Sequence, residues 1–303
     1  VVFGLIEAAE QGKAEAQHSL GVCYYYGDGV KKDLEKAVFW CTKAADQNFS
    51  EAQIFLGNCY AIGLGVEKDL EKAVFWYTKA AEQGHAKAQH ILGRCYAGGL
   101  GVEQDLEKAV FWYTKAAEQG HAEAQVLLAF RYADGMGVEK DPEKAVFWFS
   151  KAAEQGHAEA QVLLAFCYAN GEGVEKDPEK AVFWFTKAAD QNFSKAQILL
   201  GNCYITGDGV EKDPEKAVFW YTKAAEQGHA EAQEYLGHCY ADGMGVLQDY
   251  VLAHKWYNIV SSLGSEYSTW CLKELETRMT PDQIAEAQKL AREWLANWKE
   301  KGK

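Results

Sequence analysis

One pattern of apolar and polar positions recurs along most of the chain at a constant spacing. Ala73, Trp76 and Ala80 lie three and four residues apart, which is the spacing of one face of a helix. The surrounding string Glu-Lys-Ala-Val-Phe-Trp begins, at steps of 36 residues, at Glu35, Glu71, Glu107, Glu143, Glu179 and Glu215. Self-similarity at such a period is the sequence signature of a repeat architecture, in which each unit packs on its neighbours.

Each repeat is predicted to hold two helices, which we call helix A and helix B. The seven units cover residues 14–49, 50–85, 86–121, 122–157, 158–193, 194–229 and 230–265. Helix A is expected over about residues 52–61 in the second unit and 88–97 in the third. A turn follows at Gly63, because glycine lets the chain leave a helix with a positive φ. Asp69 then occupies the N-cap position, and helix B runs to Gly84.

The segments before and after the seven units differ from the repeat. Residues 1–13 match the end of a further unit and are expected to form an N-terminal cap helix. Within residues 266–303, Thr280 and Gln283 have the spacing of a capping box, with Pro281 at the first helical position. We therefore expect C-terminal capping helices, the main one from about residue 280 to 300. The chain is predicted to be an all-α solenoid.

The second unit shows which residues carry a family resemblance. They are Ala52, Gln53, Leu56, Gly57, Tyr60, Gly63, Gly65, Val66, Asp69, Lys72, Ala73, Trp76, Lys79, Ala80, Ala81 and Gly84. This unit resembles the Sel1-like repeat, a relative of the tetratricopeptide repeat, and the resemblance extends over about residues 3–265. It implies a right-handed α-solenoid of helix-turn-helix repeats. Bacterial members typically act as scaffolds, adaptors, secreted host-interaction proteins or immunity proteins that neutralise toxic effectors.

The cysteines recur at one repeat position and predict packed thiols. They are Cys23, Cys59, Cys95, Cys167, Cys203 and Cys239, with Arg131 at that position in the fourth unit. Helices of adjacent units should lie about 10 Å apart, whereas a disulfide needs Cα atoms within about 7 Å. A Cys23–Cys41 bridge within the first unit is the alternative. One cysteine-rich bacterial branch of the family has two bridged cysteines in each unit, and this chain departs from that pattern.

The charge balance and the missing motifs disfavour several function classes. Lys and Arg number 31 against 44 Asp and Glu, and the net charge of −13 disfavours nucleic acid and anionic membranes as partners. No apolar run reaches the roughly 20 residues of a membrane span. Histidines recur at His85, His121, His157 and His229, too far apart in the repeat for one metal ion. No catalytic or phosphate-binding motif occurs, so we expect no enzyme activity, no cofactor and no metal.

The N-terminus and the thiols bear on the compartment. The chain begins at Val1 without a basic and apolar leader, which is compatible with processing or with a piece of a longer chain. Unpaired cysteines are typical of a reducing compartment, while loss of a signal peptide would place the protein in the periplasm or outside the cell. Both localisations therefore stay open.

Positions that differ between the units point to a candidate binding surface. Positions fixed by stacking should repeat, and positions free of stacking can vary. On helix A the variable row that should point away from the stack reads Val22, Asn58, Arg94, Phe130, Phe166, Asn202 and His238. Tetratricopeptide-like arrays use the A helices to line a concave face that binds partners. Phe130, Phe166 and Arg94 are the expected anchors, with Tyr26, Asn58, Asn202 and His238 as a polar rim.

Two alternatives concern this surface, and three concern the function. Phe130 and Phe166 could pack inwards, and the variable turn residues offer a second edge: Asp28, Leu64, Leu100, Met136, Glu172, Asp208 and Met244. We expect a monomeric scaffold that binds a protein or peptide. The alternatives are an immunity protein that occludes a toxic enzyme, a hydrolase acting on cell-wall or antibiotic substrates, and a structural spacer.

Overall fold

The structure is a computed structural model that describes residues 2–301, and every regular element in this range is an α-helix. The bounds are α1 (Val2–Glu10), α2 (Ala14–Tyr26), α3 (Leu34–Asp46), α4 (Ser50–Ile62), α5 (Leu70–Glu82), α6 (Ala86–Gly98), α7 (Leu106–Glu118), α8 (Ala122–Asp134), α9 (Pro142–Glu154), α10 (Ala158–Asn170), α11 (Pro178–Asp190), α12 (Ser194–Thr206), α13 (Pro214–Glu226), α14 (Ala230–Asp242), α15 (Tyr250–Ser261), α16 (Glu266–Glu276) and α17 (Pro281–Lys301).

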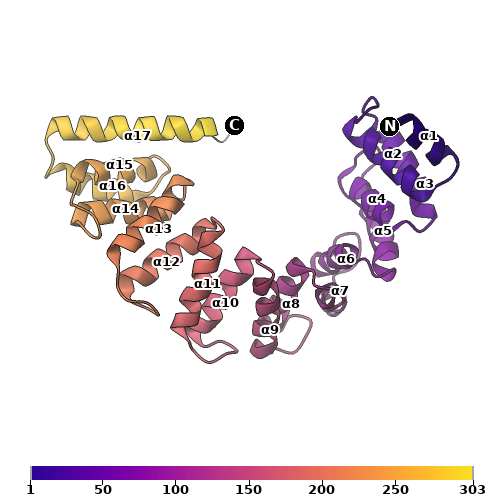
Figure 1. The fold of residues 1–303 in the computed structure, drawn as a ribbon, viewed down its shortest axis with the longest axis horizontal. Coiled ribbons are helices and arrows are strands. Elements are labelled where there is room, and N and C mark those ends of the chain that lie inside the picture. Colours follow the sequence, from indigo (N-terminus) through magenta and orange to yellow (C-terminus); the bar gives the residue numbers. More distant parts are fainter. Residues whose placement is uncertain (1, 302–303) are drawn as a thin grey trace. The chain divides into compact units, whose positions relative to one another are not determined.

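The helices form two compact parts, which we call the N-terminal half and the C-terminal half to keep them apart from the repeat units. The N-terminal half, Val1–Gln155, contains α1 to α9, and the C-terminal half, Gly156–Lys303, contains α10 to α17. From α1 to α9 and from α10 to α16 each helix lies beside the next one in the chain, and α17 lies beside α15 (Figure 1). Even-numbered helices from α2 to α14 are the A helices of the repeats, and odd-numbered helices from α3 to α15 are the B helices. The prediction of an all-α solenoid built from helix pairs is confirmed.

The A helices are longer than predicted, whereas the B helices begin at the predicted cap. Helix α4 starts two residues before Ala52, because the repeated apolar positions mark only the turns that pack. At helix α5 the Asp69 carboxylate accepts a hydrogen bond of 2.9 Å from the Lys72 backbone N–H. The Lys72 ammonium reaches the same carboxylate at 3.1 Å. Side chain and helix terminus thus stabilise each other at the start of every B helix up to α13.

The turn between helices A and B packs on the preceding repeat. Gly65 has a φ of 70°, and a Cβ atom there would collide with the Leu34 carbonyl oxygen at the start of α3. The second glycine of the turn is therefore required twice, by its backbone conformation and by the close approach of the neighbouring unit. At the other end of helix B the usual glycine is replaced by Asn48 and Asn192, each with a φ of 63°. Asparagine is one of the few side chains that tolerates this left-handed conformation.

A ladder of buried glutamines links successive helix pairs. Gln53 is fully buried, and its amide donates to the Ala45 carbonyl at 3.1 Å. Gln83, from the following helix B, donates to the Gln53 carbonyl oxygen at 2.7 Å. The same pair of bonds recurs along both halves. These bonds satisfy buried polar groups that would otherwise lower stability. The ladder ends at Gln233, whose buried Oε1 has no partner among the described residues, because Leu263 stands where the next glutamine would be.

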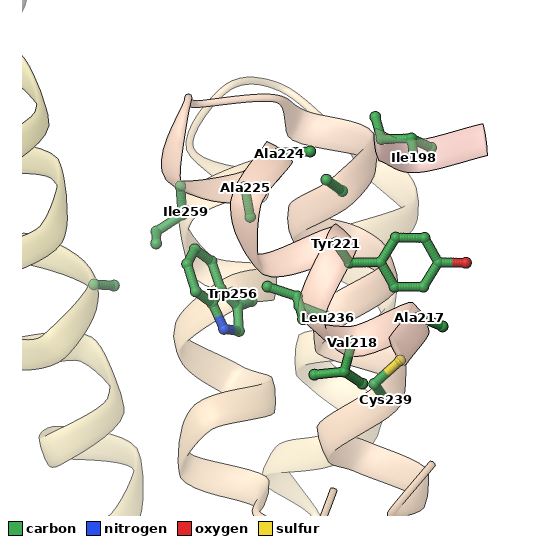
Figure 2. Packing of buried hydrophobic residues seen from close by; sticks show 12 residues of the cluster. Ile198, Ala217, Val218, Tyr221, Ala224, Ala225, Leu236, Cys239, Trp256 and Ile259 are labelled. Atoms are coloured by element: carbon green, nitrogen blue, oxygen red, sulfur yellow. The ribbon is translucent and has the colours of Figure 1, made fainter. Parts of the chain in front are cut away.

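The C-terminal helix covers the last repeat. The capping box is formed as predicted, with Thr280 N–H donating to Gln283 at 2.9 Å and Gln283 N–H donating to the Thr280 hydroxyl at 3.3 Å. Helix α17 lies beside α15, and Figure 2 shows Trp256 of α15 turned towards it. The Trp256 and Trp294 rings lie 5.8 Å apart. Large aromatic rings therefore seal the face of the last helix pair.

The cysteines are packed thiols, as predicted. All eight are free, and the alternative bridge between Cys23 and Cys41 is not formed. Burial raises the pKa of the Cys59 thiol to about 11, which keeps it protonated. Cys41 is fully buried, and its thiol packs against Gly21 and the His18 carbonyl. These thiols act as small apolar side chains.

Candidate partner-binding surface

The variable row on the A helices faces one aromatic position on the B helices. The Tyr77 hydroxyl donates to Asn58 Oδ1 at 2.8 Å, and the Tyr221 hydroxyl donates to Asn202 Oδ1 at 2.6 Å. His238 Nδ1 lies 2.9 Å from the hydroxyl of Tyr257. These polar side chains of the row therefore satisfy buried tyrosine hydroxyls, besides any contact that they make with a partner.

Phenylalanines replace the polar pair in two units. Phe130 packs edge-on against Phe149 at 5.3 Å, and Phe166 does the same against Phe185 at 5.4 Å. Phe149 and Phe185 are buried, whereas Phe130 and Phe166 are half-buried. One part of each ring in the row is thus held by its own unit, and the remainder is accessible.

The residue before the row varies with the aromatic position. Gly57 and Gly201 lie under Tyr77 and Tyr221, and a Cβ atom at either glycine would collide with the tyrosine ring. Alanine occupies this position only in the two phenylalanine units, as Ala129 and Ala165. Three positions therefore change together: Gly with a polar residue and Tyr, or Ala with Phe and Phe. The first unit has its own set, Gly21, Val22 and Cys41.

The structure divides the predicted site residues between the two halves. In the N-terminal half, Tyr26, Asn58 and Arg94 are exposed, and Val22 and Phe130 are half-buried. In the C-terminal half, Phe166, Asn202 and His238 are half-buried. Of all these residues, Asn202 and His238 are brought together in one pocket.

This pocket lies on the A-helix face of the C-terminal half. It has a volume of about 150 Å³ and is lined by Asn202, Ile205, Thr206, Tyr221, Tyr235, His238, Cys239 and Met244. The Tyr235 ring stacks on the Tyr221 ring at 4.9 Å, and its hydroxyl donates to Glu231 at 3.3 Å. Burial, with the Glu231 carboxylate adding to it, raises the pKa of Tyr235. The walls are mainly apolar and carry a few polar groups, as in binding pockets generally.

Exposed aromatic side chains continue this surface onto α16. Tyr267, whose hydroxyl lies 3.2 Å from His238 Nε2, stacks on Trp270 at 6.2 Å. Tyr267 and Trp270 are 51% and 59% exposed, high fractions for large aromatic rings. Both residues lie beyond the last repeat, so comparison of the units could not reveal them. Met244, from the predicted turn edge, lines the pocket as well.

A second surface, on the B helices, carries one exposed phenylalanine in each of six units. They are 51–53% exposed: Phe39, Phe75, Phe111, Phe147, Phe183 and Phe219. The Lys79 ammonium lies 5.0 Å from the centre of the Phe75 ring, a cation–π contact that recurs along the series. In the sequence these phenylalanines belong to the string that marks the repeat period. Because each is nearly the same in every unit, this surface distinguishes the units less than the row on the A helices does.

Two further findings concern metal ions and membranes. Over residues 2–301 no three His, Cys, Asp or Glu side chains converge into a group that could hold a metal ion. None of the helices in that range combines the length and hydropathy needed to cross a lipid bilayer.

Tandem helix pairs that expose a variable row define a repeat scaffold. The Sel1 repeat profile matches residues 14–49, 50–85, 86–121, 122–157, 158–193, 194–229 and 230–265. The chain belongs to the Sel1 repeat family, and the resemblance seen in the sequence is confirmed. Proteins of this family are generally scaffolds without catalytic activity.

Solved structures from bacteria are similar to this chain. A Sel1 repeat protein from Oxalobacter formigenes is 39% identical, with a TM-score of 0.76, over 89% of this chain and 78% of its own. The protective antigen c5321 of uropathogenic Escherichia coli, which has an SLR fold, is 34% identical, with a TM-score of 0.59, over 97% of this chain and 71% of its own. Immunity protein Pa5087 from Pseudomonas aeruginosa, at 23% identity and a TM-score of 0.41 over 70% and 81%, is too distant to bear on function. Comparison with curated proteins gives no match.

Proposed function

We propose that this protein is an interaction scaffold that binds a peptide segment of a partner protein on its A-helix face. The observation that supports this role is the pocket between α12 and α14, where Asn202 and His238 from successive repeats meet. Its volume suits one apolar side chain. The neighbouring Tyr267 and Trp270 rings offer further apolar area at the rim.

Residues of the row in the N-terminal half extend this proposal. Arg94, Asn58 and Tyr26 are exposed and can contact a partner, and Phe130 presents part of its ring. Phe166 also presents part of its ring, in the C-terminal half. Aromatic anchors with polar neighbours are the usual composition of an interaction hot spot. The pocket is the part of the row where several such groups converge, and it is therefore the part to test first.

The repeats themselves supply variants that should preserve the fold. Leucine stands at the Tyr235 position in other units, as at Leu127, and glutamate stands at the Met244 position as Glu172. The double variant Tyr235→Leu/Met244→Glu removes the aromatic wall and adds a charge at the pocket. Leu100→Glu serves as the control. It places the same charge at the equivalent turn of the third repeat, in the N-terminal half, where Leu100 is 50% exposed.

The experiment is a selection of phage-displayed random peptides on the wild-type protein. Fluorescence anisotropy then measures the affinity of the selected peptides for each variant. We expect at least a tenfold loss of affinity for the pocket variant and little change for Leu100→Glu. Circular dichroism and thermal unfolding establish that both variants are folded. Peptides that bind the pocket variant as tightly as the wild type would place the binding site elsewhere.

A further inference from the structure

The repeats contain only two arginines, and both depart from the residues of neighbouring units. Arg94 of α6 stands where the second unit has Asn58, and Arg131 of α8 stands where six units have a cysteine. They are separated by a whole repeat in the sequence. Nevertheless both lie near one residue, Tyr113 of α7. Arg94 takes the place of Asn58, whose side chain meets the hydroxyl of the equivalent Tyr77.

Tyr113 is buried close to the two arginines. Its side chain is 1% exposed, and it fits closely against α6 because position 93 is a glycine. Burial raises the pKa of Tyr113, while the guanidinium of Arg131, which is within hydrogen-bonding range, and that of Arg94 act in the opposite direction. Two elements therefore bring positive charge to one buried hydroxyl.

The hydroxyl of Tyr113 lacks the acceptor that its counterparts have. Tyr77 and Tyr221 donate to the carbonyl oxygen of an asparagine. Arginine offers only donors, so neither Arg94 nor Arg131 can accept the proton of the Tyr113 hydroxyl. An acceptor with negative charge would therefore satisfy the hydroxyl together with the guanidinium groups near it.

The two arginines also lack ion-pair partners. The ion pairs found within residues 2–301 join other residues, and none of them includes Arg94 or Arg131. The Nε atom of Arg131 is buried without a hydrogen-bond partner, and its Nη1 lies 3.7 Å from the sulfur of Met136. An unpaired, partly buried arginine is costly for a protein unless a ligand completes its surroundings.

We propose that Arg94, Arg131 and the Tyr113 hydroxyl form an anion site that binds a carboxylate side chain, Asp or Glu, of a partner protein. A guanidinium matches the two oxygens of a carboxylate, and the tyrosine hydroxyl donates to one of them. A nucleic-acid backbone fits less well, because the chain as a whole carries a charge of −13 and repels an extended polyanion. The site lies in the N-terminal half, and the proposal does not rest on the pocket of the C-terminal half.

The arginine content of the chain allows a direct test by NMR. Only Arg94, Arg131, Arg278 and Arg292 give side-chain Nε–Hε signals, so two signals report the site and two are internal controls. The probes are an acetylated and amidated Ala-Glu-Ala-Glu-Ala peptide, its Gln counterpart, inorganic phosphate, and an oligouridylate. We expect the Glu peptide to shift the signals of Arg94 and Arg131 saturably, and the Gln peptide to leave them unchanged.

A variant built from the second unit provides the matched control. Arg94→Asn/Arg131→Cys introduces the residues found there as Asn58 and Cys59, so the fold should be kept. It should bind the Glu peptide at least tenfold more weakly by isothermal titration calorimetry, whereas Tyr235→Leu/Met244→Glu should bind it as the wild type does. Equal shifts with the Glu and Gln peptides, unchanged binding by the arginine variant, or tighter binding of phosphate or oligouridylate would each overturn the proposal.

Discussion

The hydroxyl of Tyr77 donates a hydrogen bond of 2.8 Å to Asn58 Oδ1, and Gly57 lies directly against the same tyrosine ring. The equivalent trio in the fourth unit is Ala129, Phe130 and Phe149, in which two rings meet edge to face. Each trio fills the space between helix A and helix B in a different way. The variable row is therefore coupled to the core of its own unit, and a substitution in the row acts on stability and on the surface together.

This coupling predicts that the trio can be exchanged only as a whole. Gly57→Ala alone should destabilise the protein by about 1–3 kcal/mol, because the added methyl group collides with the Tyr77 ring. The triple variant Gly57→Ala/Asn58→Phe/Tyr77→Phe should recover most of that loss, since it reproduces the fourth unit. Urea unfolding of the single, double and triple variants measures the coupling. Strictly additive effects would show that the three positions are independent.

The fold was predictable from the sequence because its punctuation repeats. Asp69 and Gly84 mark the ends of helix B through local hydrogen bonds and backbone conformation, which need no knowledge of tertiary structure. The start of helix A was predicted two residues late, since Ala52 is the first residue that packs and not the first that is helical.

The candidate site was less predictable, for two physical reasons. Variation between repeats predicts freedom from packing, but the residue at the Asn58 position changes together with that at the Tyr77 position, because Asn58 accepts the hydrogen bond of the Tyr77 hydroxyl. Comparing two positions at a time would have shown this. Tyr267 and Trp270 follow the last repeat, where no neighbouring unit supplies a register for comparison.

The end of the glutamine ladder can be repaired. Gln233 Oε1 is buried without a partner, and Leu263, at the position of the missing glutamine, is 62% exposed. Leu263→Gln should donate a hydrogen bond to Gln233 and stabilise the protein by about 1 kcal/mol, measured as a rise in thermal midpoint. Leu263→Ala, which removes the leucine without adding an amide, is the control. A glutamine variant no more stable than the alanine variant would contradict this account.

The aspartate caps should make stability depend on pH in the acid range. The backbone N–H of Lys108 and then its side chain lower the pKa of Asp105 below its ordinary value of 3.8, and five other caps behave alike. The folded state holds these carboxylates ionised, so their contribution is present above the ordinary pKa and is lost as the pH falls through the lowered one.

The measurement is the thermal midpoint as the pH falls from about 5 through the ordinary carboxyl pKa of 3.8 and below it. Asp69→Asn/Asp105→Asn/Asp141→Asn keeps side chains that can cap a helix but do not titrate. Its midpoint should therefore fall less over this range than that of the wild type. Parallel curves for the two proteins would assign the acid sensitivity to other carboxylates.

His90 should cause a separate loss of stability on acidification, in a pH range above that of the aspartate caps. Burial, with the neighbouring charges of His121 and Arg94 adding to it, lowers the pKa of His90 from 6.5 to about 4, and Glu123 acts weakly in the opposite direction. The unfolded chain therefore takes up a proton first as the pH falls. Stability due to the neutral ring is complete above about pH 6.5 and is lost progressively down to the folded-state pKa near 4.

Proton NMR titration of the His90 ring gives its folded-state pKa directly. His90→Ile, which introduces the residue found as Ile54 in the second unit, should flatten the dependence of unfolding free energy on pH between about 6.5 and 4. The ring lies 4.7 Å from His121, so the wild-type titration should also respond to His121→Phe, which introduces the residue found as Phe49 in the first unit. Removing that neighbouring charge should raise the pKa of His90. A His90 ring that titrates at its ordinary value in the folded wild type would show that its surroundings are as well hydrated as the unfolded chain.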